Sequence, residues 1–497
     1  MIPLIARAKA HGDQTAIISP EGTFTYRHLV EASSRVSSGL LEGRKDLSEE
    51  RVAFLTPRGF VYPAVQWGIW RAGGIAVPLC EIHPSSELNY VIRDSNTDIV
   101  VAHPQFVAQL RPMAEELGIR FLLTDYLMES PIGQLPEIDS AKRAMILYTS
   151  GTTGRPKGVV STHFNIQAQV ISLIKAWEWT SNDYILHVLP LHHVHGIMNI
   201  LTCALWAGAK CEILPKFDSH VVWQKFIERD FTLFMAVPTI YVRLIEAWEA
   251  APPDRQQMML EACRKFRLMV SGSAALPVAV LEKWREITGH TILERYGMTE
   301  IGMALSNPVH GERVPGYVGK SLPGVDVRLV DESGNPTLPG TSGEIQVKSP
   351  SVFLEYWRRS EETKKAFQDG WFCTGDIAVI ERGIYRILGR RSSDIIKTGG
   401  YKVSALEIEE VLRTHPAIKD CAVVGLEDPV WGERVCAALI LHSGEMLTLN
   451  EIRTWGKEKF APYKVPSRIL ILESLPRNPL GKITKPALRR LFESASA

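Results

Sequence analysis

A long alternation of short apolar runs and longer amphipathic stretches constrains the fold of this chain more than any other feature. The alternation extends from residue 1 to about residue 388, and the series 97–101, 105–117 and 120–124 is one example of it. The short runs are rich in β-branched residues and have the length of buried strands, whereas the longer stretches have the period of helices. Such an order is typical of parallel sheets covered by helices. We therefore predict an α/β fold with a large N-terminal part of stacked α/β layers.

The pattern changes twice toward the C-terminus. Between Val314 and Val347, short strand-like runs are broken by Pro-Gly and Asn-Pro turns, which predicts a small β region with antiparallel strands. Near Gly389 to Ser392, a strand-like run gives way to a charged turn, and a helix that Ser404 can cap follows. We predict two domains, residues 1–389 and residues 390–497, the second being a small mobile α/β domain.

Composition and charge exclude several classes of protein. The chain has 497 residues, of which 45% are hydrophobic and 22% are charged, as in ordinary globular proteins. A net charge of +1 without a run of basic residues gives no electrostatic footprint for nucleic acid. The seven cysteines are scattered and lack CxxC spacing, which argues against disulfides or a zinc site and fits a reducing compartment. No apolar run is long enough to cross a bilayer and no secretory signal is visible. We expect a small-molecule substrate.

Hydroxyls, glycines and two cations are concentrated in one turn, from Tyr148 to Gly158, directly after an apolar run. Glycines let the backbone approach phosphate oxygens, the hydroxyls donate hydrogen bonds, and Lys157 supplies a point charge. The spacing is not that of a Walker A loop, because Pro156 stands where the second glycine is required. The turn predicts a polyphosphate-binding loop, although a flexible surface loop has a similar composition.

Six segments in the same order resemble motifs of the adenylate-forming enzymes, the superfamily of acyl-CoA synthetases, firefly luciferase and peptide-synthetase adenylation domains. They are the 148–158 turn, Ser271 to Pro277, Tyr296 to Glu300, Thr374 to Asp376, Gly389-Arg390 with Lys397 to Lys402, and Pro476 to Lys482. The resemblance covers nearly the whole chain. It implies two steps, in which ATP first converts a carboxylate into an acyl-adenylate and the thiol of CoA then displaces AMP, with Mg²⁺ as the metal cofactor.

The resemblance also implies roles for individual residues. ATP and AMP would be bound by Thr149, Ser150, Gly151, Thr152, Thr153, Gly154, Lys157, Ser271, Gly272, Ser273, Ala274, Glu294, Arg295, Tyr296, Gly297, Met298, Thr299, Asp376 and Arg390. Asp376 would accept from the ribose hydroxyls and Glu300 would bind Mg²⁺. The implied catalytic residues are Lys482, His193 and Thr299. The CoA tunnel would be lined by His193, Lys397, Gly399, Gly400 and Lys402, and Ser392 would be the hinge. The alternative for Lys482 is a solvated lysine, like Lys485 beside it.

Within the superfamily, the chain most resembles the malonyl-CoA synthetases, which include a mitochondrial enzyme and plant and bacterial relatives. The segments 187–196, 267–277 and 293–308 carry this resemblance. A dicarboxylate keeps one charged carboxylate in the pocket, and burying that charge requires a cation, for which arginine is best suited. Arg267 is our first candidate and Arg313 the reserve, and Thr239 would line the same pocket. The alternative for Arg267 is an anchor for the strand that follows it.

Three histidines, His192, His193 and His195, form a cluster after an apolar run. The resemblance to the adenylate-forming enzymes implies that His193 is the gate between the acyl pocket and the thiol tunnel, and we interpret His192 and His195 as core histidines. A metal site is not expected, since no cysteine or carboxylate in the cluster completes a ligand shell.

Besides malonate, methylmalonate is the second substrate that we consider.

Three other functions stay open at this point. The chain fits a medium-chain or aromatic acyl-CoA synthetase, an adenylation domain that loads a carrier protein, or a catalytically inactive nucleotide-binding regulator. The expected partners are malonate, ATP and CoA, with no nucleic acid and no membrane span. The protein would act as a monomer or a homodimer, in the mitochondrial matrix if the source is eukaryotic and otherwise in the cytoplasm, without secretion.

Overall fold

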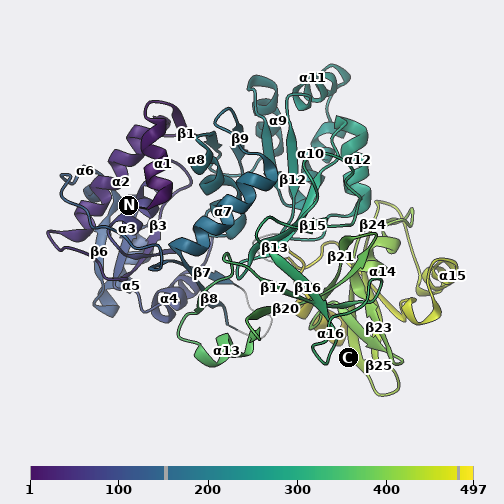
Figure 1. Ribbon diagram of the computed structural model, residues 1–497. Helices are drawn as coiled ribbons and strands as arrows, with labels where there is room; N and C mark the ends of the chain where they lie inside the picture. The colour runs from purple at the N-terminus through teal and green to yellow at the C-terminus, as the bar shows by residue number, and fades with distance from the viewer. Residues whose placement is uncertain (1, 150–154, 478–481, 496–497) are drawn as a thin grey trace. The chain divides into compact units, whose positions relative to one another are not determined.

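The computed structural model describes residues 2–149, 155–477 and 482–495, and it confirms the α/β class (Figure 1). The chain forms two compact units. The first contains residues 1–315, 319–327 and 347–372, and the second contains residues 316–318, 328–346 and 373–497. The hairpin that precedes residue 390 thus groups with the C-terminal unit. The predicted boundary between residues 389 and 390, after which the chain would move as a separate domain, stays a prediction.

A seven-stranded sheet forms one layer of the first unit, in the order β18-β8-β7-β4-β3-β5-β6. Strands β7, β4, β3, β5 and β6 run parallel, and β8 and β18 are antiparallel to their neighbours. The strand bounds are β3 Arg51–Leu55, β4 Ile75–Pro78, β5 Ile99–Ala102, β6 Arg120–Leu123, β7 Arg143–Thr149, β8 Lys157–Thr162 and β18 Glu355–Tyr356.

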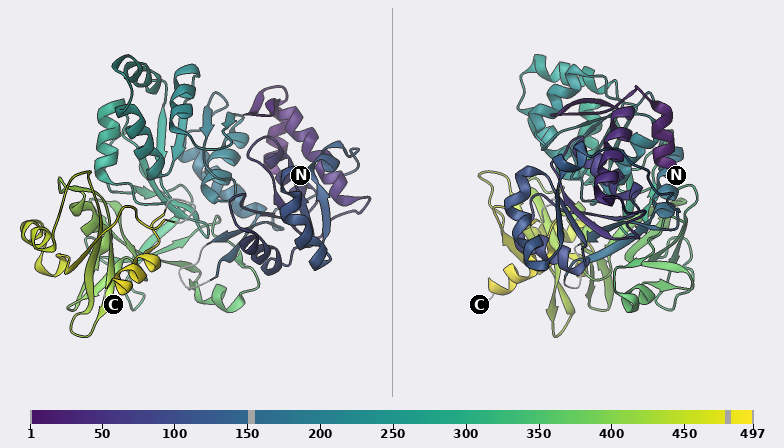
Figure 2. Two further views of the ribbon diagram at one scale, coloured as in Figure 1. Left: turned by 180° about the vertical axis from the view of Figure 1, so that it is seen from behind. Right: turned by 90° about the vertical axis from the view of Figure 1, so that its left-hand side faces the viewer.

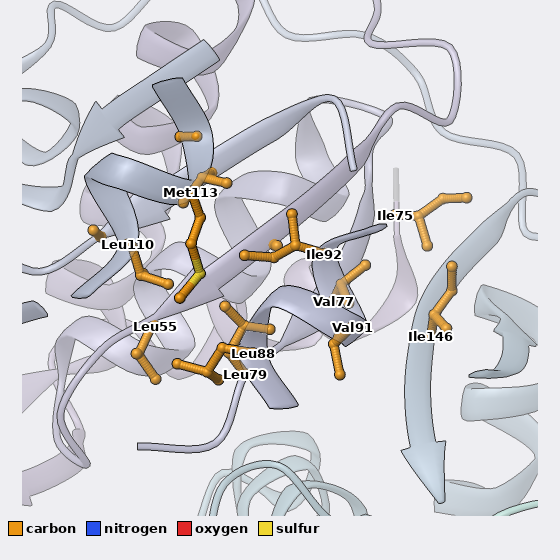
Figure 3. Packing of buried hydrophobic residues seen from close by; sticks show 14 of the residues in the cluster. Leu55, Ile75, Val77, Leu79, Leu88, Val91, Ile92, Leu110, Met113 and Ile146 are labelled. Carbon is orange, nitrogen blue, oxygen red and sulfur yellow. The ribbon is translucent and has the colours of Figure 1, made fainter. Parts of the chain in front are cut away.

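Helices α4 (Ser85–Asp94) and α5 (Val107–Leu117) pack on this sheet. Figure 3 shows Leu88 and Ile92 of α4 on the side of Leu110 and Met113 of α5, and Val91 beside Val77 of β4, all within one apolar cluster. The predicted order of strand, helix and strand over residues 97–124 is therefore confirmed, and its apolar periodicity builds the core.

A nine-stranded sheet forms a second layer, in the order β15-β14-β13-β12-β11-β9-β10-β1-β2. Six neighbouring strands, from β13 to β1 in this order, run parallel. The strand bounds are β1 Thr15–Ser19, β2 Gly22–Thr25, β9 Tyr184–His187, β10 Lys210–Ile213, β11 Leu233–Ala236, β12 Leu268–Ser271, β13 Leu293–Met298, β14 Gly302–Ser306 and β15 Lys320–Ser321. The inner parallel strands β12, β11, β9 and β10 are almost entirely buried, as expected for a sheet covered by helices.

The helices of the first unit cover these sheets. Figures 1 and 2 show α1 and α2 side by side near the N-terminus, and Figure 1 shows α9 to α12 grouped beside the nine-stranded sheet. The remaining bounds are α1 Pro3–His11, α2 Tyr26–Leu41, α3 Val61–Arg71, η1 Pro104–Phe106, α6 Thr124–Glu129, α7 His163–Trp177, the π-helix η2 His195–Thr202, α8 Cys203–Ala207, α9 Ser219–Glu228, α10 Pro238–Glu249, α11 Pro253–Cys263, α12 Val278–Thr288 and α13 Ser360–Lys365.

A five-stranded sheet contains the small β region that the turn-rich sequence predicts. Its order is β16-β17-β20-β19, with β21 paired to β20. The bounds are β16 Asp326–Val330, β17 Gly343–Lys348, β19 Phe367–Gln368, β20 Trp371–Glu381 and β21 Ile384–Arg390. Strands β20 and β21 form an antiparallel hairpin that places Asp376 opposite Arg390.

The C-terminal sheet has the order β23-β22-β25-β24, with β26 parallel to β25. Successive residues of β24 face opposite sides: Val423 packs with Ile408 and Leu412 of α14, whereas Val424 packs with Leu488 of α16. The period of two thus gives the sheet a helix layer on each face. The bounds are β22 Ile395–Thr398, β23 Tyr401–Ser404, α14 Ala405–Leu412, β24 Ile418–Asp428, β25 Gly432–Leu441, α15 Leu449–Lys459, η3 Pro462–Lys464, β26 Arg468–Ile471 and α16 Lys485–Ser494.

The predicted cap of α14 is confirmed, because the hydroxyl of Ser404 accepts a hydrogen bond from the backbone N–H of Glu407. The hairpin of β24 and β25 is longer than its two apolar runs indicate, since paired polar residues extend both strands beyond the buried part. Across the described ranges, no helix combines the length and apolar character that a bilayer crossing needs.

Candidate active site

Several motif residues of the first unit lie at one edge of the nine-stranded sheet, at or beyond the carboxyl ends of its parallel strands. Strand β9 leads into the histidine segment, β11 leads into Thr239, and β12 ends at Ser271. Strand β13 is paired with β12 so that Glu294 lies beside Ser271. Because these strands run parallel, segments that are far apart in the sequence meet at the same edge. This edge is the candidate active site.

A hydrogen-bonded cluster of three side chains stands at this edge. Arg295 Nη2 donates to Ser273 Oγ over 3.3 Å, and Ser273 Oγ lies 3.2 Å from His195 Nδ1. Ser273 has a φ of +71°, a left-handed conformation that is rare for a residue with a side chain and is found at functional turns. Gly272 lies against the guanidinium, since a Cβ at this position would come within 2.6 Å of Arg295 Cζ.

Arg295 is the most unusual charge of the site. The residue is 4% exposed, its Nε has no hydrogen-bond partner, and no acidic partner is found for it among the residues that the structure describes. Burial lowers the pKa of Arg295 to about 9, so the guanidinium is still charged at neutral pH. A buried arginine without a counter-ion is costly unless a ligand supplies the negative charge. The sequence assigned Arg295 to nucleotide binding and missed this environment, which only the tertiary structure creates.

A second cluster surrounds Glu300, which is 6% exposed. Its Oε1 accepts a hydrogen bond of 3.0 Å from the hydroxyl of Tyr356, and its backbone carbonyl accepts one of 2.7 Å from Phe353 N–H. The ammonium of Lys157 lies over the Tyr356 ring, 5.2 Å from its centroid, and pairs with Glu362. The structure thus brings together the lysine of the polyphosphate loop and the glutamate of the second nucleotide motif.

The polyphosphate loop connects two antiparallel strands, and Thr149 of β7 pairs with Lys157 of β8. Ser150, Gly151, Thr152, Thr153 and Gly154 lie outside the described residues. On the far side of the loop, the carbonyl of Pro156 accepts a hydrogen bond of 2.7 Å from Tyr90.

The second nucleotide motif continues along β13. Glu294 is buried, whereas Tyr296, Gly297, Met298 and Thr299 are partly exposed. Gly297 is required by close packing, since a Cβ there would come within 2.1 Å of the carbonyl oxygen of Gly302.

Arg267 lies at the opposite end of its strand. It precedes β12 by one residue, and Ser271 ends that strand, so at a rise of about 3.3 Å per residue the two are separated by roughly 13 Å along the strand. The guanidinium forms a bidentate ion pair with Asp183, with both distances 2.7 Å, and also donates to the backbone carbonyls of Trp177 and Glu178. This geometry favours the anchor role, which the sequence left open.

The other two candidates for the substrate pocket differ from each other. Arg313 donates from all three of its nitrogens to the backbone carbonyls of Pro308, Thr291 and Val309, so it also ties loops together. Thr239 follows the carboxyl end of β11 in the first turn of α10 and is partly exposed at the edge that carries Ser273. The structure therefore keeps Thr239, rather than Arg313, at the candidate site.

In the second unit, Asp376 is 7% exposed and forms a bidentate pair with Arg390, at distances of 2.8 and 3.2 Å. Its backbone N–H donates to the hydroxyl of Thr374, which in turn donates to the carbonyl of Ile345. The carboxylate of the predicted ribose motif is thus held in one orientation.

The Gly399-Gly400 pair is the turn of a hairpin between β22 and β23. Both glycines have positive φ, +55° and +84°, which is the signature of a two-residue type I′ turn. Lys397 lines an open pocket of about 710 Å³ together with Asp428 and Glu433. Lys402 pairs with Glu332 over 2.6 Å, and Ser392 is exposed in the turn after β21.

Lys482 is exposed, which agrees with both of its interpretations, so its catalytic role stays a prediction. The comparison of Lys482 with a solvated Lys485 is wrong. Lys485 is 9% exposed, and its ammonium donates to Glu409 Oε1 and to the carbonyl of Val423, both over 2.5 Å. The two lysines differ because Lys485 begins helix α16, which packs on the sheet, whereas Lys482 precedes that helix.

The histidine segment also differs from expectation. His187 is fully buried, and its Nε2 lies 3.0 Å from the carbonyl of Gly196. Desolvation lowers its pKa to about 4, so it is neutral. The sequence predicts that no cysteine adds a metal ligand to the histidine cluster. This prediction is wrong, because Cys80 and His83 lie close to His192. The Cys-x-x-His spacing of Cys80 and His83 was the signal available in the sequence.

The comparisons with known proteins agree with this geometry. The family model for AMP-binding enzymes matches residues 4–357, and that for the AMP-binding enzyme C-terminal domain matches residues 407–482. The chain belongs to the AMP-binding enzyme family. Among curated relatives of this AMP-binding enzyme, the mitochondrial malonate–CoA ligase ACSF3 of Homo sapiens is 48% identical over 99% of this chain and 92% of its own length. The malonate–CoA ligase of Arabidopsis thaliana is 41% identical over 97% of this chain and 87% of its own.

Among solved structures, ATP-bound MatB from Rhodopseudomonas palustris covers 100% of both chains with a TM-score of 0.92 and 34% identity. The o-succinylbenzoate CoA synthetase of Bacillus subtilis, in complex with its acyl-adenylate intermediate, covers 98% of both chains with a TM-score of 0.85 and 27% identity. The fold of this AMP-binding enzyme is therefore that of adenylate-forming enzymes.

Proposed function

We propose that this AMP-binding enzyme is an ATP-dependent malonate–CoA ligase, which converts malonate, ATP and CoA into malonyl-CoA, AMP and pyrophosphate. The observation that carries the proposal is the buried guanidinium of Arg295, which has no acidic partner among the described residues and stands beside Ser273 at the carboxyl edge of the sheet. The relatives named malonate–CoA ligase, at 48% and 41% identity, support the same substrate.

Arg295 distinguishes a dicarboxylate from an ordinary fatty acid. One carboxylate of malonate reacts while the other stays charged, and a bidentate pair with a guanidinium compensates the burial of that charge. Ser273 Oγ, already bonded to Arg295, is a further polar contact for it. An apolar acyl chain at the same place would leave the buried arginine unpaired, at a cost of several kcal/mol. The site therefore favours malonate over hexanoate or benzoate, and Thr239 would limit substituents on the α-carbon.

In the first step, an oxygen of the reacting carboxylate attacks the α-phosphorus of ATP, and the bond to the pyrophosphate oxygen breaks. Thr149, Lys157 and the loop between them would hold the β- and γ-phosphates, Thr299 would contact the α-phosphate, and Asp376 would accept from the ribose hydroxyls. Lys482 would bridge the α-phosphate and the carboxylate and so stabilise the charge that develops between two anions.

The carboxylate of Glu300 fits Mg²⁺, which prefers hard oxygen ligands, and the hydrogen bond from Tyr356 orients it. When bound, Mg²⁺ supplies charge neutralisation at the phosphates. Lys157 is at present paired with Glu362, an interaction that the phosphates would replace.

In the second step, the CoA sulfur attacks the acyl carbonyl carbon and AMP leaves with the electrons of the broken C–O bond. We propose that His193 gates the thiol tunnel and that Lys397, Gly399, Gly400 and Lys402 line it. A rotation of residues 390–497 about Ser392 would withdraw Lys482 from the site after the first step. The same rotation would bring this hairpin to the site for the second step. The exposure of Ser392 in a turn supports its role as the hinge. For a eukaryotic source we propose the mitochondrial matrix, as the mitochondrial relative suggests.

The proposal is tested by measuring AMP and pyrophosphate with malonate, methylmalonate, succinate, acetate, hexanoate and benzoate, each in the presence of ATP, Mg²⁺ and CoA. We expect AMP formation with malonate, and a slower reaction with methylmalonate. Turnover of hexanoate or benzoate in place of malonate would assign the chain to the medium-chain or aromatic synthetases. Binding of ATP without AMP formation from any acid would assign it to the inactive regulators.

A further inference from the structure

A cysteine and two histidines from separate segments meet in the first unit. Among the described residues, a ligand atom of Cys80, one of His83 and one of His192 all lie within 4.8 Å of one another. Cys80 and His83 belong to the turn after β4, and His192 precedes the π-helix η2. The rings of His83 and His192 lie edge to face, with centroids 5.8 Å apart. None of the three side chains has a role in the proposed adenylation chemistry.

His192 is prepared to act as a ligand. Its Nε2 is buried and has no hydrogen-bond partner, which is costly for a polar atom unless something binds it. An unprotonated imidazole nitrogen carries the lone pair that a metal ion binds.

His83 and Cys80 are also positioned by their neighbours. The Nδ1 of His83 lies 3.3 Å from a carboxylate oxygen of Glu87, one helical turn away, which leaves Nε2 as the metal donor and reproduces the carboxylate–histidine pairing common at metal sites. The backbone N–H groups of Ile82 and His83 donate to the sulfur of Cys80. A coordinated cation would bind Cys80 as the thiolate.

We propose that Cys80, His83 and His192 form a binding site for a borderline-soft divalent cation of the Zn²⁺ class. One sulfur and two imidazole nitrogens are the donors that Zn²⁺ prefers, whereas Mg²⁺ prefers oxygen, so the site is distinct from that at Glu300. With Zn–S of about 2.3 Å and Zn–N of about 2.1 Å, ligand atoms of a tetrahedral site lie roughly 3.5 Å apart, so donors that lie within 4.8 Å of one another need to approach by at most about 1.3 Å. Three protein ligands leave the fourth position for water.

A metal at this site would join the turn after β4 to the histidine segment that leads to His195. Binding would therefore stabilise the first unit against unfolding, in proportion to the logarithm of the free metal concentration. Because neither malonate, ATP nor CoA takes part, the inference does not rest on the proposed function.

The test uses Co²⁺ as a spectroscopic probe for Zn²⁺ in the purified full-length chain, freed of metal beforehand. We expect one Co²⁺ per chain, with a thiolate-to-metal charge-transfer band in the near ultraviolet and its loss on addition of Zn²⁺. Cys80→Ser should abolish the band. Cys373→Ser should leave the band unchanged, since Cys373 lies in the second unit and its sulfur accepts a hydrogen bond from the side-chain amide of Gln346. Absence of the band in the unmodified chain, or its persistence in Cys80→Ser, would overturn the proposal.

A second pair of variants guards against a folding defect of Cys80→Ser. His83 is partly exposed at the surface, with 28% of its side chain accessible, so His83→Gln should fold normally. We expect this variant to bind Co²⁺ at least tenfold more weakly, and Glu87→Gln to weaken binding by about tenfold, as for loss of a supporting carboxylate. Zn²⁺ should raise the unfolding temperature of the unmodified chain and not that of His83→Gln. Equal affinity and equal stabilisation in both would count against the site.

Discussion

Replacement of Arg267 by leucine tests the anchor role against the substrate role. The change removes the bidentate pair with Asp183 and the bonds to the carbonyls of Trp177 and Glu178. The side chain of Asp183 is 2% exposed, so its carboxylate would stay buried with only the backbone N–H of Thr180 and the hydroxyl of Thr232 as strong donors. The sequence alone predicts a loss of malonate use from this change, whereas the structure predicts a loss of stability.

The magnitude follows from the burial of the pair. Removing one partner of a fully buried ion pair costs about 3–5 kcal/mol. The Arg267 side chain is 31% exposed, so water screens part of the interaction, and we expect about 2–3 kcal/mol. For a unit of this size, at about 2.1 cal/mol/K of unfolding entropy per residue, that corresponds to a fall in unfolding temperature of about 3–4 °C. The Km for malonate should change less than twofold.

The assay follows thermal unfolding of the purified chain by near-ultraviolet circular dichroism, together with malonate kinetics. Arg264→Leu, at an exposed arginine nearby, is the matched control and should leave both measurements unchanged. In an Asp183→Asn background, Arg267→Leu should have a much smaller effect, because the charge it compensates is gone. An unaltered unfolding temperature combined with a large rise in the Km for malonate would refute the anchor role.

The pair also predicts a dependence on pH. Burial alone would raise the pKa of Asp183, but the hydrogen bonds from Arg267, Thr180 and Thr232 outweigh it and hold that pKa below its usual value. The carboxylate therefore binds its proton more weakly in the folded state, and the pair stabilises the fold at pH values above the unfolded pKa. This contribution is lost as the pH falls through the folded pKa. The difference between the unmodified chain and Arg267→Leu should shrink under acid conditions.

Four further changes test the site and the C-terminal unit. Arg295→Leu should abolish malonate turnover while ATP binding persists, and a variant with normal malonate kinetics would remove the main support for a dicarboxylate substrate. Gly272→Ala, whose Cβ would come within 2.6 Å of the Arg295 guanidinium, should raise the Km for malonate several-fold, which steady-state kinetics would detect. Lys482→Ala should raise the activation free energy of adenylation by about 3 kcal/mol, while thioester formation from preformed malonyl-AMP survives. Equal loss of both half-reactions would contradict the role assigned to Lys482. Lys485→Ala should destabilise the C-terminal unit by about 2 kcal/mol, because it leaves the buried carboxylate of Glu409 with only the more distant Arg413 and the backbone N–H of Val423, and an unchanged unfolding profile would show that the pair contributes nothing.

Local patterns in the sequence determined the class of fold and the chemistry. The spacing of apolar residues specifies strands and helices because each element must bury one face, and residues 97–124 form the predicted strand, helix and strand. The cap at Ser404 needs only residues three positions apart, and it forms as predicted. The hydroxyl groups and glycines that predict polyphosphate binding likewise lie within a few residues of one another in the sequence.

The tertiary structure alone decided which charged side chains face the site and which hold the fold together. Arg267 precedes one strand and Arg295 lies in the next strand of the same sheet, yet Arg267 meets Asp183 at the amino end, whereas Arg295, at the carboxyl edge, has no acidic partner in the described part of the chain. Cys80 and His192 are likewise far apart in the sequence and become neighbours only through folding. The cost of burying a charge or a polar atom depends on every group packed around it, and those groups come from distant segments that no local pattern specifies.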